Sequence, residues 1–164
     1  MPKISPLRAK QPASLHELSR AVTGQLDQAG LVDAIHQQVA RVLDVRHLVI
    51  LLHDETRDEM EVVLRVSDGV RIDGERRWQP ARESGLTPAV MASGRPVRTD
   101  DYVAECARRG VAPAVAAAGL PHWLGVPMTA GDRVLGVLAL KSRDRAFTED
   151  DERLLANIAQ LAAL

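Results

Sequence analysis

One cysteine and five histidines are the residues best suited to catalysis or metal binding in this sequence of 164 residues. Cys106 is alone, so an intrachain disulfide and an all-cysteine metal site are excluded. His47 and His53 belong to one expected strand, which places them on the same face but roughly 20 Å apart. One ion cannot bind both at that separation. We therefore expect neither a metal site nor a cofactor.

The sequence also lacks the short motifs that mark common active sites. It contains no glycine-rich phosphate loop, no nucleophile elbow and no HExxH sequence. Since no set of residues suggests a catalytic centre, we expect that the protein is not an enzyme.

Aromatic residues are few, and Trp123 is the one whose surroundings best suit ligand binding. A large rigid indole in a mostly aliphatic sequence can stack on a planar ligand, and it can equally belong to the core. His122 beside it is either a ligand contact or a polar residue that is satisfied locally. Residues around the end of an expected strand at 96–99 can supply further polar contacts. The candidate ligand-binding residues are Trp123, His122, Tyr102, Asp101 and Arg98.

The overall composition limits the partners. Lys and Arg together number 21 against 22 Asp and Glu, which gives a net charge of −1. Nucleic acids and anionic membrane surfaces usually require a basic excess. No apolar run approaches the ~20 residues that cross a bilayer, and the N-terminus lacks the apolar region of a secretory signal. We expect a cytoplasmic protein that binds neither nucleic acid nor membranes.

The N-terminal part of the chain changes character near residue 14. Residues 1–14 contain three prolines and no apolar periodicity, which is typical of a disordered lead-in. Apolar residues then recur at spacings of three and four over 15–26 and again over 31–42, which predicts two amphipathic helices. The remaining 15–164 has the length of one domain.

Two β-hairpins are predicted on either side of an irregular middle. Apolar runs at 47–53 and 60–66 flank a short polar turn, and strand-like segments at 123–129 and 134–142 flank a second turn. Within the middle, Ser84 is placed to cap a short helix and Gly94 to end it. The other expected elements are a weak strand within 68–80, a helix over 86–92, a strand at 96–99, and a short helix and a second helical turn within 101–118.

The last helix is predicted to begin at Thr148. Asp151 lies three residues further on and gives a pair that resembles a capping box. The helix reaches Leu164 without a Gly, Asn or Pro to end it, so we expect a piece of a longer protein. Apolar stripes on the first and last helices exceed what one sheet face needs, which predicts a homodimer joined through these helices. The stripes are Leu15, Leu18 and Val22 on the first helix and Leu154, Ile158 and Leu161 on the last.

The order of these elements predicts the fold class. Two helices precede a hairpin, an irregular middle with short helices follows, and a second hairpin leads into the last helix. This order is typical of an α+β fold with a mostly antiparallel sheet, and it predicts helices over one face of that sheet.

Several segments together resemble one known family. Residues 119–128 and 131–138 resemble the C-terminal signature of a GAF domain. The segments 31–44, 48–54, 94–100 and 147–155 resemble further parts of the same family in the same order. The resemblance covers about residues 15–164. It implies a six-stranded antiparallel sheet with flanking helices, and ligands held between the sheet and the irregular middle, here roughly residues 78–121.

The same resemblance bears on two further sets of residues. His122 stands where the signature commonly has Ser. Residues near the C-terminus match the spacing of a motif found in cyclic-nucleotide-binding members, but Leu140 replaces the leading Asn of that motif. We favour a structural interpretation, in which a lysine leaving a strand pairs with an aspartate in the first turn of the next helix. The residues that match are Lys141, Phe147, Asp151 and Glu152.

The resemblance implies a non-enzymatic regulatory domain, of the kind found in sensor histidine kinases and transcriptional activators. Such a domain binds a small molecule and signals through dimer-forming terminal helices to an attached effector, here expected on the C-terminal side. One alternative is a ligand-free dimerisation connector. Another is a free methionine-R-sulfoxide reductase, but such enzymes need a second thiol to resolve the sulfenic acid, and only Cys106 is present. Cys106 is instead expected to be a small buried thiol.

Overall fold

The computed structural model describes residues 28–72 and 77–162. The chain divides into two compact units, Met1–Ala34 and Ile35–Leu164. In the first unit the described residues, 28–34, form the first half of helix α3 (Gln28–Val42). The predicted lead-in over 1–14 and the predicted helix over 15–26 lie outside the described residues. The helix predicted over 31–42 is confirmed.

The second unit is built on a seven-stranded antiparallel sheet in the order β3-β2-β1-β7-β6-β5, with β4 also paired to β2. Both predicted hairpins are present, as β1–β2 and β6–β7. The strands are β1 (Leu48–Asp54), β2 (Glu59–Ser67), β3 (Val70–Ile72), β4 (Arg77–Pro80), β5 (Val97–Thr99), β6 (His122–Ala130) and β7 (Arg133–Ser142).

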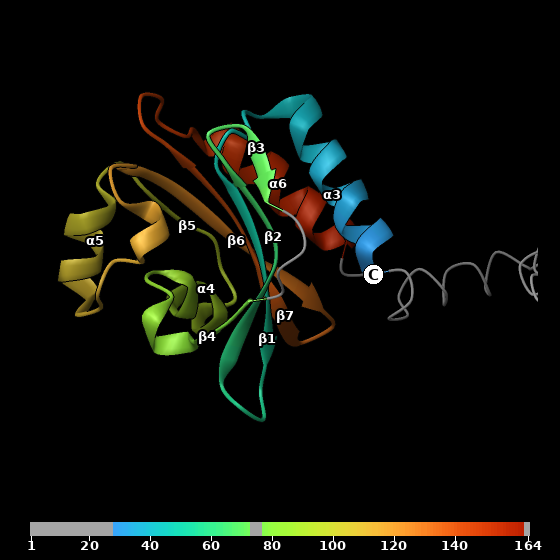
Figure 1. Cartoon of the computed structure of the whole chain (residues 1–164), viewed down its shortest axis with the longest axis horizontal. Helices are drawn as coiled ribbons and strands as arrows, with labels where there is room; N and C mark the ends of the chain where they lie inside the picture. Colours follow the sequence, from blue (N-terminus) through green and yellow to red (C-terminus); the bar gives the residue numbers. More distant parts are fainter. Residues whose placement is uncertain (1–27, 73–76, 163–164) are drawn as a thin grey trace, which may run out of the picture. The chain divides into compact units, whose positions relative to one another are not determined.

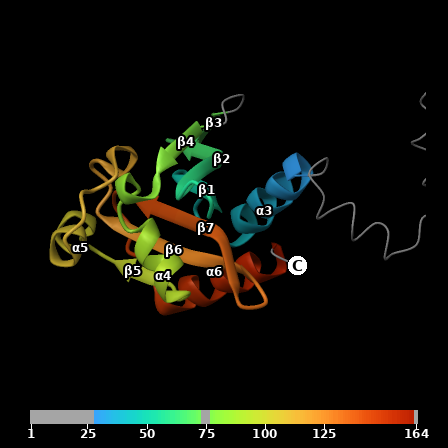
Figure 2. The same cartoon turned by 90° about the horizontal axis from the view of Figure 1, so that it is seen from below.

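Helical elements cover both faces of the sheet, as Figures 1 and 2 show. On one face lie four short elements: η2 (Ala81–Glu83), α4 (Thr87–Ser93), α5 (Tyr102–Arg109) and η3 (Val115–Ala117). On the other face lie α6 (Glu149–Ala162) and the part of α3 from Ile35 onward. The expectation of helices over one face alone is wrong. Successive residues of β1 and β7 are apolar and buried, so these central strands require cover on both sides.

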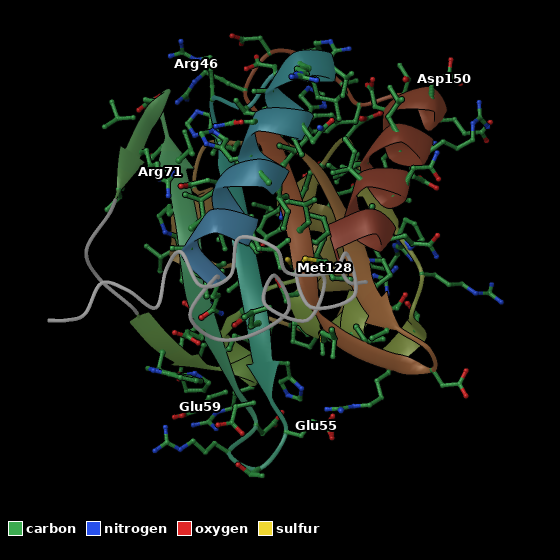
Figure 3. The ribbon with its side chains drawn as sticks, turned by 90° about the vertical axis from the view of Figure 1, so that its right-hand side faces the viewer. Arg46, Glu55, Glu59, Arg71, Met128 and Asp150 are labelled. Carbon is green, nitrogen blue, oxygen red and sulfur yellow. The ribbon has the colours of Figure 1, made fainter. Side chains whose placement is uncertain are left out.

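The two faces carry separate cores. The face beneath α4 and α5 contributes Val49 and Ala139 to a buried cluster that also includes Leu86 and Val90. The opposite face carries fully buried leucines such as Leu140. Figure 3 shows α6 and the part of α3 from Ile35 onward lying across this second face, where Met128 is labelled. Buried residues of α6 include Leu155 and Ala159, and those of α3 beyond residue 34 include Ile35 and Val39.

The short helices begin and end largely as their sequences predict. Gly94 ends α4 in the left-handed conformation, at φ 65°. Predicted capping of α4 by Ser84 is wrong, because Leu86 occupies the N-cap position and forms no side-chain cap. The Ser84 hydroxyl instead donates to the Pro80 carbonyl and accepts from the Gln79 amide at 2.8 Å.

Two β-bulges decide which side chains face α4 and α5. The β1–β2 register shifts by one residue after Ile50, and the β6–β7 register shifts after Met128. Because side chains alternate between faces, a shift of one residue moves a side chain to the other face. The cross-strand pairs that result on this face are Val49 with Arg65 and Trp123 with Lys141.

No helix in the ranges 28–72 and 77–162 is both long enough and apolar enough to cross a membrane.

Candidate ligand-binding site

A cavity of about 360 Å³ lies between the sheet and the short elements that cover it. Strands β1, β2, β6 and β7 supply its floor, and the remaining sides come from the β4–η2 segment, α4, α5 and the chain around η3. The lining side chains include Val49, Leu51, Arg65, Gln79, Glu83, Ser84, Thr87, Tyr102, Ala114, Val115, Ala116, Trp123 and Lys141. The lining therefore combines apolar side chains with several polar and charged groups.

Lys141 is the charged group held deepest in this cavity. It lies near the end of β7, and only 8% of its surface is exposed. Within the described residues its ammonium forms no hydrogen bond and no ion pair. Burial and the nearby Arg65 guanidinium lower the pKa of Lys141 to about 8. A buried ammonium without a counter-charge is costly for a fold.

Trp123 and Tyr102 form the aromatic part of the wall. Their ring centroids are 5.9 Å apart, with the planes inclined at 42°. The Tyr102 hydroxyl accepts a hydrogen bond from the Ala114 amide at 3.1 Å, and burial raises the pKa of Tyr102 to about 12. Gly85 makes room for this hydroxyl, because a Cβ atom there would lie 1.8 Å from it. Tyr102 thus fixes the segment before η3 against α4.

The Trp123 ring is held over the backbone of its own strand. A Cβ atom on Gly125 would lie 2.3 Å from the six-membered ring, so only glycine permits this position. The indole N–H forms no hydrogen bond with the described part of the chain. Thr87, at the start of α4, is also buried, and its hydroxyl likewise has no hydrogen-bond partner among residues 28–72 and 77–162. The cavity therefore presents several donor groups without partners.

The structure brings two of the five predicted site residues to this cavity, Trp123 and Tyr102. Asp101 is the N-cap of α5, where its carboxylate accepts from the Ala104 amide at 3.1 Å. His122 lies next to Asp100, with Nδ1 3.3 Å from the carboxylate.

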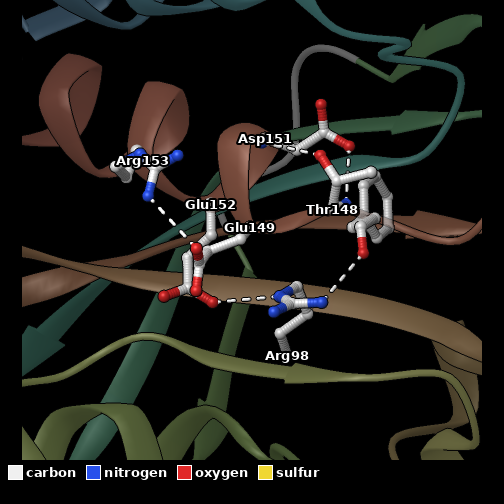
Figure 4. Close-up of polar contacts among 7 residues, drawn as sticks. Arg98, Thr148, Glu149, Asp151, Glu152 and Arg153 are labelled. Carbon is white, nitrogen blue, oxygen red and sulfur yellow. Dashed lines mark hydrogen bonds and ion pairs between the residues drawn. The ribbon is translucent and has the colours of Figure 1, made fainter.

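Arg98 lies on the side of the sheet edge where α6 begins. Its guanidinium donates to the Phe147 carbonyl at 3.1 Å and forms an ion pair with Glu152 at 3.1 Å (Figure 4). Arg98 thus links β5 to the first turn of α6 and does not line the cavity.

The predicted Lys141–Asp151 pair is not formed. Asp151 accepts from the Thr148 amide at 2.8 Å, and the Thr148 hydroxyl accepts from the Asp151 amide at 3.1 Å (Figure 4). Arg145 also lies 3.4 Å from the Asp151 carboxylate. The capping box predicted for this helix is therefore confirmed. Phe147 is buried beside it, so three of the four motif residues hold α6 while Lys141 faces the cavity.

Cys106 is fully buried on α5, as predicted, and burial raises the pKa of its thiol. A raised pKa keeps the thiol protonated and unreactive. Among the described residues no cluster of three or more His, Cys, Asp or Glu side chains could hold a metal ion.

A second and more open hollow, of about 650 Å³, lies beside the β1–β2 and β6–β7 turns. Two pairs of its side chains already contact each other. His53 contacts Asp58 at 3.0 Å, and Glu55 forms an ion pair with Arg133 at 3.2 Å. The cavity that contains Lys141 is the better candidate site for this reason.

Reasoning from the sequence missed Thr87 and Arg65, and it gave Lys141 a different role. One signal was available: Lys141 follows the uncharged run 134–140 of β7, and a charged residue is unusual at a buried position of a central strand. Arg65 gave no such signal, because β2 contains other charged residues. No local pattern distinguishes Thr87 from other threonines at the start of a helix.

Comparison with known families decides the classification. The model of the GAF domain matches residues 25–164. The chain belongs to the GAF domain family. GAF domains are regulatory and sensory modules of signalling proteins, and both the α+β class and the antiparallel sheet with flanking helices are confirmed by this match.

Solved structures with the same fold have diverse functions. A methyl-accepting chemotaxis protein, residues 122 to 287, matches with a TM-score of 0.71 and 16% identity, over 88% of this chain and 92% of that one. The GAF domain of an Acinetobacter phosphoenolpyruvate-protein phosphotransferase matches with a TM-score of 0.61 and 21% identity, over 85% of this chain and 90% of that one. The free methionine-R-sulfoxide reductase of Neisseria meningitidis matches with a TM-score of 0.57 and 21% identity, over 84% of this chain and 78% of that one. Comparison with curated protein sequences gives no significant match. Identities this low show a shared fold alone.

Proposed function

We propose that this GAF domain is a non-enzymatic regulatory module that binds a small molecule in the cavity beneath α4 and α5. The observation that carries the proposal is the cavity itself, whose lining includes Trp123, Tyr102 and a Lys141 ammonium without a partner among the described residues. Ligand sites in proteins usually combine an apolar concave surface with a few such polar groups.

The elements that cover the cavity suit a response to a ligand. Helix α4 has 7 residues and α5 has 8, while η2 and η3 each have 3. Short elements of this kind can change their arrangement at low cost. A ligand that binds one arrangement more tightly shifts the population toward it. That shift is the signal we propose.

We propose further that the signal reaches an attached effector domain, on the C-terminal side, through helices that join a cytoplasmic homodimer. One observation supports α6 as part of that interface. Leu154 is 41% exposed on α6, although Leu155 and Ala159 on the same helix are fully buried. Light scattering at micromolar concentration tests this idea. We expect a dimer for the wild type and a monomer for Leu154→Glu, whereas a wild-type monomer would remove the basis for it.

Tryptophan fluorescence tests ligand binding. The chain contains two tryptophans, and the exposed Trp78 can be replaced by Phe so that Trp123 is the single indole emitter. We expect that a screen of cyclic nucleotides, purines and small acids, amides and amines finds a saturable change in emission. That change should be lost in Trp123→Ala while circular dichroism shows an intact fold. If calorimetry detects no binding by any class of compound, the ligand-free connector is the better interpretation.

Catalysis by Cys106 requires a separate test, because a reductase shares this fold. A buried thiol with a raised pKa is a poor nucleophile. We expect no reduction of free methionine sulfoxide by the wild type, and unchanged ligand affinity in Cys106→Ser. Measurable reduction that disappears in Cys106→Ser would show that the protein is an enzyme.

A further inference from the structure

Building on the proposed function, we infer that the ligand of this cavity is a small organic acid whose carboxylate binds the ammonium group of Lys141. Several polar groups of the cavity have no hydrogen-bond or ion-pair partner among the described residues, and these groups indicate what the ligand must supply.

The first step is the isolation of the Lys141 charge. Its side chain is more than nine-tenths buried and lines the cavity, yet its ammonium forms neither a hydrogen bond nor an ion pair within the described residues. Asp151, the carboxylate expected to pair with Lys141, is bound to Thr148 and Arg145. A buried charge is normally paired. An anion that enters the cavity would supply the pair.

The second step is the nature of the other groups without partners. The Trp123 indole N–H is a donor and cannot accept, and the Thr87 hydroxyl can donate. Trp123 lies directly opposite Lys141 in the β6–β7 ladder, which brings the indole and the ammonium to one part of the floor. A ligand group that accepts several hydrogen bonds and carries negative charge complements this set.

The third step distinguishes a carboxylate from a phosphate. One ammonium lacks a counter-charge, and it balances one negative charge. Arg65 and Glu83 also line the cavity, and their opposite charges offset one another. The lining is thus left with one net positive charge, which matches a monoanion better than a phosphate dianion. The lining also contains apolar side chains, with Val49, Leu51 and Ala114 among them. A monocarboxylate with an apolar or aromatic body matches both features.

The charge state of the cavity agrees with this assignment. Burial and the neighbouring Arg65 lower the pKa of Lys141 to about 8, so the ammonium is mostly protonated at neutral pH. The other titratable groups that line the cavity are Arg65 on β2, Glu83 on η2 and Tyr102 on α5. A bound carboxylate would raise the pKa of Lys141 toward its usual value.

Matched acids and amides test the inference. Benzoate, phenylacetate and isovalerate are compared with benzamide, phenylacetamide and isovaleramide by calorimetry and by Trp123 emission in the Trp78→Phe background. Each acid and its amide have nearly the same shape, so the comparison isolates the charge. We expect the best acid to bind about 10- to 100-fold more tightly than its amide. Lys141→Met should lower the affinity for that acid by a similar factor while leaving the affinity for the amide nearly unchanged.

The control variant is Arg133→Met, which removes a positive charge from the same strand at a site outside this cavity. It should keep the wild-type preference for acids. Circular dichroism of every variant checks the fold. Equal binding of acids and amides, or full affinity for the acid in Lys141→Met, would overturn the inference.

The possible failures are distinguishable. If none of the six compounds binds but a neutral or cationic compound from the wider screen does, the proposed ligand-binding function stands and the carboxylate assignment fails. If phenyl phosphate binds more tightly than phenylacetate, the anion is a phosphate and the carboxylate assignment is again wrong. If no compound of any class binds, both the inference and the proposed function fail.

Discussion

Trp123 and Lys141 lie directly opposite one another on neighbouring strands, and both line the same cavity. A rigid indole and a buried ammonium therefore share one part of the sheet floor. Their effects on binding should not be additive, because neighbouring groups that contact one ligand usually couple.

Replacing Lys141 with Met should stabilise the ligand-free protein. The substitution keeps an unbranched chain of similar length and removes a buried charge that has no counter-charge among the described residues. We expect the free energy of unfolding at neutral pH to rise by about 1–3 kcal/mol. Urea denaturation measures the change. Arg133→Met, at an exposed position, should change stability by less than about 0.5 kcal/mol. A loss of stability in Lys141→Met would mean that the ammonium has a partner.

The stability gained by Lys141→Met should depend on pH. The pKa of Lys141 is about 8 in the folded protein and about 10.4 for a solvated lysine in the unfolded chain. Between these values the unfolded state binds more protons, so wild-type stability rises with pH relative to the variant. The advantage of the variant should therefore shrink from about pH 7 to about pH 9.5. Tyr102, whose pKa is raised to about 12, stays protonated in the folded state over this range.

Urea denaturation of both proteins at several pH values measures this difference. Other titrating groups are common to the two proteins and largely cancel. A constant difference across the range would show that the pKa of Lys141 is not lowered in the folded protein.

Removal of the Tyr102 hydroxyl should loosen the segment before η3. In Tyr102→Phe the partly buried Ala114 amide loses its acceptor, which normally costs about 1–3 kcal/mol. We expect faster hydrogen exchange at the Ala114 amide, measured by nuclear magnetic resonance, while amides of the β1–β7 ladder keep their protection. Phe retains the ring next to Trp123, so the aromatic wall is preserved. Unchanged exchange at Ala114 would contradict an anchoring role for Tyr102.

The first turn of α6 should depend on its capping box. Thr148→Ala removes the acceptor of the Asp151 amide hydrogen bond, and loss of a threonine cap costs about 1 kcal/mol. The exposed Glu149 of the same turn is the control, because Glu149→Gln keeps its size and lies outside the box. Thermal denaturation should show a lower Tm for Thr148→Ala and a nearly unchanged Tm for Glu149→Gln. Equal Tm values for Thr148→Ala and the wild type would refute the energetic role of the cap.

Local patterns predicted most of the described elements. The hairpins follow from apolar runs on either side of short polar turns, and the start of α6 follows from the spacing of Thr148 and Asp151. Gly94 ends α4 because a left-handed residue is needed there. These features depend on residues close in sequence, which is why the sequence alone predicts them.

The cavity depends on register, which local patterns do not specify. Continuing the pairing of Ala130 with Arg133 without a bulge would set Trp123 opposite Leu140. Lys141 would then point to the α6 side of the sheet. The extra residue in β7 shifts the pairing by one, so Trp123 lies opposite Lys141 and both face the cavity. The bulge in β2 likewise places Arg65 opposite Val49, on the cavity side. Bulges form where the whole sheet packs best, so the role of Lys141 could not be predicted from spacing.

Because side chains alternate along β7, neighbouring residues of this strand face the two opposite sides of the sheet. Lys141 faces the cavity, while the adjacent Leu140 is buried on the α6 side of the sheet. Their Cα atoms are about 3.8 Å apart and joined by a rigid peptide unit. Any shift of the β7 backbone at Lys141 would therefore also shift Leu140 in the opposite core. The cavity and the core beneath α6 thus share one strand, and no hinge is needed to connect them.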